Sequence, residues 1–267
     1  MTVALARRPD RFRAALALWF VVWLAMLVLL FSGTRIALGP LTLRTLKLDG
    51  SFIAEWFPFI SQGVLITLEL AVISIIGASA LAFASALARL SRVPSINSLA
   101  GLYISLIRGT PLYLQFLFIY WALPQLNVVL TSMQAAIAAL SLNYGAYMSE
   151  IFRAGIQAVS SGQTEAASAL GMTPWQTMRR IVLPQAFRIV VPDIGNQFIA
   201  MQKDTALASA IAVEELMGRA RQAGLPRQHF FEALVVAAAW YWLMTIVMTA
   251  FQTRLEHRMA RSDRATA

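Results

Sequence analysis

The chain has 267 residues, 58% of them hydrophobic and only 13% charged, and its formal net charge at pH 7 is +9. Soluble domains carry about twice that share of charged residues, so the composition predicts an all-α integral membrane protein. A transmembrane barrel is excluded because runs such as LWFVVWLAMLVLLF are apolar on every side. The sequence has no cysteine, which excludes disulfides, thiolate catalysis and cysteine-bound metals.

Six apolar segments, each long enough to cross about 30 Å of hydrocarbon, follow one another along the chain. They lie at residues 14–32, 58–88, 99–123, 131–156, 188–213 and 232–253. The first has basic residues ahead of it, as a secretory signal does, but its apolar core runs to about 18 residues and no small-residue cleavage motif closes it. We therefore expect a retained transmembrane helix, followed at residues 33–57 by an external connector without a core of its own.

Basic residues predict the orientation of these six helices. An even number of spans places both termini on one side, and if that side is the cytoplasm, the inner segments carry fourteen arginines against six basic residues in the outer segments. Cytoplasmic flanks hold the excess of Lys and Arg, so we expect cytoplasmic N- and C-termini. The remaining two basic residues, Arg108 and Lys203, fall within spans. The positive charge then reflects topology and attraction to membrane lipid, and no nucleic-acid partner is needed to explain it.

Residues 160–184 are too polar to lie in a membrane and predict two short helices at its surface. Gln163 to Leu170 are helix formers, and Gly171 supplies the left-handed residue that commonly ends a helix. The run TPWQ that follows matches a capping box with proline at the first helical position. Pro184 is expected to end the second helix.

This pair of helices has two interpretations on physical grounds. The first helix carries small residues, Ala166 and Ala167 among them, which allow a partner surface to approach the backbone closely. It is therefore a candidate docking element for a cytoplasmic protein. An amphipathic connector lying on the lipid headgroups accounts for the composition equally well.

The residue pattern favours docking. Glu165-Ala166-Ala167, then three residues, Gly171, then nine residues and IVLP, resembles the EAA signature of permease subunits of bacterial ABC importers. Four more segments look like successive parts of the polar amino acid uptake branch of that family, over about residues 60–258. They read GVLITLELAVIS, LYISLIRGTPLYLQFLFIYWALP, LNYGAYMSEIFRAGIQAV and VVPDIGNQFIAMQKDTALASAI. The first span is a departure, because many relatives begin with the helix that here starts near Pro58.

The resemblance implies a five-helix importer permease core preceded by one extra transmembrane helix, with a cytoplasmic coupling helix. Residues 1–57 would hold the N-terminus, the extra helix and the connector, residues 58–258 the permease domain, and residues 259–267 a cytoplasmic tail. The coupling segment at about 160–184 would contact the ATPase. The residues expected to do so are Glu165, Ala166, Ala167, Leu170 and Gly171.

The same resemblance implies the partners. They are a second permease, identical or related, two separate ATPase subunits that bind ATP and Mg²⁺, and an extracytoplasmic amino-acid-binding protein at the bacterial inner membrane. The chain itself is expected to have no cofactor, metal or catalytic residue. Independently of family, a phosphate-binding loop needs Gly before its Lys, and neither Lys47 nor Lys203 follows a glycine.

Polar groups inside apolar spans are costly, so they mark candidate residues of a solute pathway. The candidates are Glu69, Arg108, Gly109, Thr110, Asn143, Asp193, Gln197, Lys203 and Asp204. After Arg108, proline at position 111 removes an amide and disfavours helix at Thr110, which predicts a span broken beside a cation.

A zwitterionic amino acid would need a cation for its carboxylate and an acid for its ammonium group. Arg108 or Lys203 suits the carboxylate, and Glu69, Asp193 or Asp204 the ammonium. Mutual pairing, snorkelling of Arg108 to the interface and helix packing around Asn143 explain the same residues without a solute.

Other functional classes fit less well. A stand-alone secondary transporter of a small polar solute is the main alternative, but it leaves the EAA-like segment unexplained. An intramembrane enzyme lacks its motifs, and a channel lacks a filter sequence. The sequence leaves open whether the cargo is an amino acid or an opine-like compound, which one, and whether the dimer is homomeric.

Overall fold

The computed structural model describes residues 10–38 and 41–265, and the chain divides into two compact units, residues 1–55 and 56–267. Arg7 and Arg8, which entered the orientation argument, lie outside the described residues. The first unit contains helix α1, Asp10–Leu30, and an antiparallel hairpin of β1, Arg35–Leu38, and β2, Leu41–Arg44. Apart from this short hairpin, which the sequence did not predict, the regular structure of the described residues is helical.

Helix α2, Gly50–Ser61, begins inside the predicted connector rather than after it. The cause is a local cap, because the carboxylate of Asp49 accepts hydrogen bonds from the backbone N–H of Ser51 at 2.9 Å and of Phe52 at 3.2 Å. Such a cap satisfies amides that have no partner within the helix. The second apolar segment therefore starts about eight residues earlier than its hydrophobicity indicates.

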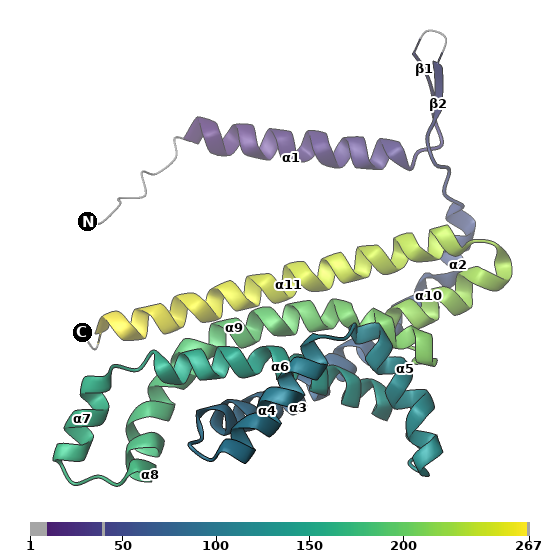
Figure 1. Ribbon diagram of the computed structural model, residues 1–267. Coiled ribbons are helices and arrows are strands. Elements are labelled where there is room, and N and C mark those ends of the chain that lie inside the picture. The colour runs from purple at the N-terminus through teal and green to yellow at the C-terminus, as the bar shows by residue number, and fades with distance from the viewer. Residues whose placement is uncertain (1–9, 39–40, 266–267) are drawn as a thin grey trace. The chain divides into compact units, whose positions relative to one another are not determined.

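The second unit is built from helices joined by short connections (Figure 1). They are α3, Gly63–Leu90; α4, Pro94–Arg108; α5, Leu112–Ala122; α6, Ser132–Gln157; α7, Ser161–Ala169; α8, Pro174–Thr177; α9, Leu183–Asp204; α10, Leu216–Gly224; and α11, Phe230–Ala265. The 3₁₀ turns η1, Leu123–Leu126, η3, Thr205–Ile211, and η4, Leu225–Arg227, follow α5, α9 and α10. A π-helical turn, η2, Met178–Val182, joins α8 to α9.

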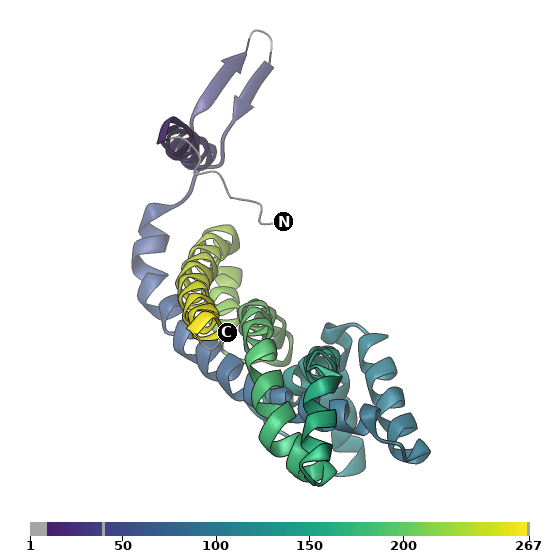
Figure 2. The same ribbon diagram turned by 90° about the vertical axis from the view of Figure 1, so that its left-hand side faces the viewer.

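Helix α6 lies at the centre of this unit and packs against α3, α4, α5 and α9. Figures 1 and 2 both show α6, α9 and α11 side by side. Small residues permit the close packing: a Cβ on Gly77 would lie 2.6 Å from the hydroxyl of Ser141, and one on Gly155 would lie 2.2 Å from Cγ2 of Val190. Close approach of backbones through small residues is the usual means of helix association in lipid.

Two helical segments of the described chain are long and apolar enough to cross a membrane, Gly50–Leu90 and Phe230–Met259. A third candidate is the pair Pro94–Arg108 and Leu112–Leu126, which passes the test only as a bent unit. The apolar part of α1, Ala14–Leu30, is shorter. The structure thus gives a helical membrane protein with two clear spans, and the total of six stays a prediction.

The prediction that Pro184 ends the second surface helix is wrong. The helix continues from α8 through η2 into α9 without leaving helical backbone angles. Proline has no N–H for the carbonyl four residues back and its ring crowds that carbonyl. Here the chain accommodates Pro184 through the widened turn just before it, and such π turns are frequent at functional sites.

A buried carboxylate ties α10 to the rest of the unit. The side chain of Glu215 is fully buried and accepts hydrogen bonds from the backbone N–H of Met217 at 3.0 Å and of Gly218 at 2.7 Å. The hydroxyl of Tyr241 on α11 donates to the same carboxylate at 2.6 Å, and Thr67 on α3 accepts from the backbone N–H of Leu216. These contacts fix the start of α10 against α3 and α11.

Candidate functional site

The site is built where the third apolar segment breaks. Helix α4 ends at Arg108, Gly109 caps it, and Pro111 precedes the first residue of α5, with the two helix axes bent by 105°. The predicted break beside a cation is confirmed. Its cause is the proline, which supplies no amide to the α4 ladder and holds its own backbone extended at ψ 137°.

A buried amide closes this corner. Nε2 of Gln115 donates to the carbonyl of Ile107 at 2.8 Å, and to the carbonyl and hydroxyl of Thr110 at 3.1 and 2.9 Å. Pro111 has no N–H for the carbonyl of Ile107, four residues before it, so the side chain of Gln115 supplies the missing donor there and also ties down Thr110. Oε1 of Gln115 accepts from Nδ2 of Asn143 at 3.1 Å, which attaches the corner to α6. Sequence reasoning did not single out Gln115; its signal was a polar residue four positions after the proline in an otherwise apolar run.

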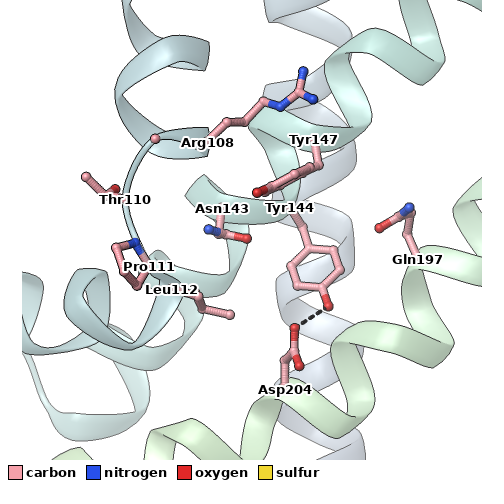
Figure 3. Close-up of a pocket in the computed structure, with 10 residues that line it drawn as sticks. Arg108, Thr110, Pro111, Leu112, Asn143, Tyr144, Tyr147, Gln197 and Asp204 are labelled. Carbon is pink, nitrogen blue, oxygen red and sulfur yellow. Dashed lines mark hydrogen bonds between the residues drawn. The ribbon is translucent and has the colours of Figure 1, made fainter.

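A cavity of about 500 Å³ opens beside the corner, between α4, α5, α6 and α9 (Figure 3). Its wall contains charged, amide and aromatic side chains together. The lining residues are Arg108, Gly109, Thr110, Pro111, Leu112, Asn143, Tyr144, Tyr147, Gln197 and Asp204.

Two opposite charges line this cavity without forming a pair. The guanidinium of Arg108 lies 5.1 Å from the centre of the Tyr147 ring, a cation–π contact, and has no carboxylate partner among the described residues. The carboxylate of Asp204 accepts a hydrogen bond from the hydroxyl of Tyr144 at 2.7 Å (Figure 3). A cation without an ion-pair partner and a carboxylate that accepts a single hydrogen bond lie in one cavity, which suits a ligand that carries both charges.

Six of the nine residues proposed for the pathway line this cavity: Arg108, Gly109, Thr110, Asn143, Gln197 and Asp204. The other three lie elsewhere. Glu69 and Lys203 are exposed on α3 and α9, and Asp193 lines a different cavity beside Glu150. Tyr144 and Tyr147 were missed, although Tyr147 follows Asn143 by four positions and so lies on the same face of α6.

The predicted docking segment has the local structure its sequence indicates. Helix α7 ends before Gly171, whose φ of +75° is left-handed, and Thr173 and Gln176 form the capping box of α8. The α7–α8 pair projects beyond the ends of α6 and α9 (Figure 1). Leu170 and Trp175 on it are 82% and 68% exposed.

Within the segment, Glu165 and Ala166 are exposed, as are Leu170 and Gly171, whereas Ala167 is buried. Large apolar side chains exposed together on a projection outside the apolar spans are typical of a surface that binds another protein.

A helical core around a broken span, a polar cavity beside the break and a projecting helix pair define the class as a membrane transport permease. The chain belongs to the family of binding-protein-dependent transport system inner membrane components, whose model matches residues 78–261. It is therefore a membrane-spanning transport permease of an inner-membrane family.

Named relatives and a solved structure agree with this assignment. The chain is 40% identical to the L-cystine transport system permease protein TcyB of Bacillus subtilis, over 78% of this chain and 89% of the relative. It is 37% identical to the arginine transport system permease protein ArtQ of the same organism, over 82% of this chain and 100% of the relative. A crystal structure of an amino acid ABC transporter with histidines matches 80% of this chain and 100% of its own, with a TM-score of 0.74 and 35% identity.

Proposed function

We propose that this chain is the permease subunit of an ATP-driven importer that carries a zwitterionic polar amino acid into the cell. The observation that carries the proposal is the cavity in which Arg108 and Asp204 present opposite charges without pairing. Relatives named for transport of cystine and arginine support the class of cargo.

In this proposal the α-carboxylate of the amino acid binds the planar guanidinium of Arg108, which can hold both oxygens at once. The α-ammonium group binds the carboxylate of Asp204, whose position Tyr144 fixes by its hydrogen bond. The amides of Asn143 and Gln197 offer further donors and acceptors along the wall. Selection then rests on the simultaneous fit of both charges.

The broken span provides the moving part. Interrupted helices form the substrate sites of many transporters, because helix ends and unwound backbone there can contact the solute. The bend at Gly109 to Pro111 joins α4 and α5 directly beside the cavity. A small rotation of α4 about this point would carry Arg108 with it and expose the cavity to one side of the membrane or the other.

Energy for this motion comes, in the proposal, from ATP and Mg²⁺ bound to a separate ATPase. That subunit receives the α7–α8 pair, with Glu165 as the polar contact and the exposed Leu170 and Trp175 as apolar ones. A second permease copy or relative and an extracytoplasmic binding protein complete the importer. Both termini and α7 then lie in the cytoplasm, with six spans in all.

The test is uptake by the purified complex in proteoliposomes, with the ATPase and binding protein that it retains. Radiolabelled L-cystine, L-arginine and L-glutamine are the probes, each measured with and without ATP. We expect ATP-dependent uptake of at least one, and a fall of about 10- to 100-fold in uptake efficiency for Arg108→Gln, since a hydrogen bond to a charged group contributes about 1.5–3 kcal/mol.

The matched control is Arg221→Gln, which removes an exposed arginine on α10 away from the cavity. It should retain uptake close to that of the wild type. Uptake that follows an ion gradient and ignores ATP would replace the proposal with a secondary transporter. Equal activity of Arg108→Gln and wild type would exclude Arg108 from the binding site.

A further inference from the structure

Two more cavities continue from the first along the surface of α6. One of about 440 Å³ is bounded by Arg89, Ser105, Arg108, Gly109 and Glu150, so it shares Arg108 and Gly109 with the first cavity. The next, of about 420 Å³, shares Glu150 with the second cavity and adds Asp193. Because each cavity shares lining residues with the next, the three cavities lie one after another.

Helix α6 supplies a side chain to each cavity in turn. Asn143 and Tyr147 line the first, Glu150 the second, and Glu150 with Ala154 the third. Spacings of four, three and four residues place these side chains on one face of a helix. The stripe runs about 16 Å along α6 at 1.5 Å per residue, toward the end that leads into α7.

The second cavity, like the first, contains both a carboxylate and guanidinium groups, but here the carboxylate is in an ion pair. Nε and Nη2 of Arg153 both contact Oε2 of Glu150, at 2.8 and 2.6 Å, and Oε1 of Glu150 has no partner among the described residues. On another wall, the guanidinium of Arg89 lies where Gly101 leaves room: a Cβ there would be 3.2 Å from Nη1 of Arg89. The carboxylate of Glu150, with one oxygen available, thus lines the same cavity as Arg89 and Arg108.

We propose that the cavity of Arg89, Arg108 and Glu150 is a second, transient binding site for the zwitterion on its way to the cytoplasm. This inference rests on the proposed function. Arg108 belongs to both sites, so the amino acid keeps its carboxylate on that guanidinium while its ammonium group exchanges Asp204 for Glu150. No step then leaves either charge without a partner in a region where an isolated charge is costly.

The inference is tested by separating binding from release. Glu150→Gln keeps the shape of the side chain and an acceptor for Arg153 but removes the charge. We expect binding of the labelled amino acid that the wild type imports, measured on the complex in nanodiscs without ATP, to change by less than about twofold in Kd. ATP-dependent uptake of the same amino acid should fall about tenfold or more, because the path inward has lost its partner for the ammonium group.

The control is Arg153→Gln, which breaks the ion pair within α6 and leaves the carboxylate of Glu150 in place. It should retain at least about half of the wild-type uptake, since a partly exposed pair three residues apart contributes only a few tenths of a kcal/mol. Unchanged uptake in Glu150→Gln overturns the second site, and so does an equal loss in both variants, which would assign the effect to the ion pair. A wild type that imports none of the three probes refutes the proposed function itself.

Discussion

Replacing Gln115 by Leu tests whether a side chain substitutes for the backbone at the broken span. The amide group of Gln115 has two N–H donors, shared among two carbonyls and a hydroxyl, and its oxygen accepts from Asn143. That is the equivalent of three hydrogen bonds, each contributing about 1 kcal/mol net, and Leu conserves the volume without replacing any of them. We therefore expect a loss of about 3 kcal/mol in the free energy of unfolding.

The assay is thermal unfolding of the purified protein in detergent. A loss of about 3 kcal/mol corresponds to a fall in Tm of roughly 6–12 °C for a domain of this size. Gln125→Leu is the matched control, because Gln125 lies exposed on η1 and should shift Tm by no more than about 1–2 °C. Equal shifts in the two variants would refute the reasoning and show that the corner at Thr110 holds without its amide.

Two further predictions concern the projecting segment and the core. Glu165→Lys should leave membrane insertion intact and reduce the stimulation of ATPase activity by substrate about tenfold. Gln163→Lys on the same helix is the control and should retain that stimulation. Full stimulation in the Glu165→Lys complex would contradict the docking role. Gly155→Ala should destabilise the protein by about 1–3 kcal/mol, because its Cβ would lie 2.2 Å from Val190, whereas Gly162→Ala, where the nearest atom would be 3.6 Å away, should not lower Tm. Equal melting temperatures for these two alanine variants would show that α6 and α9 separate without cost.

The features predicted correctly from sequence are those that one residue and its neighbours determine. Gly171 takes the left-handed conformation, Thr173 caps its helix, and the chain breaks after Arg108, because each depends on local backbone sterics. Family membership was equally accessible, since the EAA pattern lies within one continuous segment, and the family match confirms it.

The errors concern features that depend on contacts between segments far apart in the sequence. Pro184 was expected to end a helix, but packing of Val182 and Ala186 against α6 holds the helix on both sides of the proline, and a π turn absorbs the difference. The cavity could not be assembled from sequence either, because it needs the position of α6 relative to α4 and α9. Asp193 and Gln197 share a helix, yet only Gln197 reaches the first cavity.

The bend between α4 and α5 also arranges charge that belongs to no side chain. Aligned peptide units give a helix a partial negative charge at its C-terminus and a partial positive charge at its N-terminus, each about half an elementary charge. At this corner the end of α4 and the beginning of α5 meet at the cavity wall, and Arg108 stands at the negative end. The main chain thus builds a fixed dipole into the wall, and in the proposed function this dipole would contribute to binding of a zwitterion alongside the charged side chains.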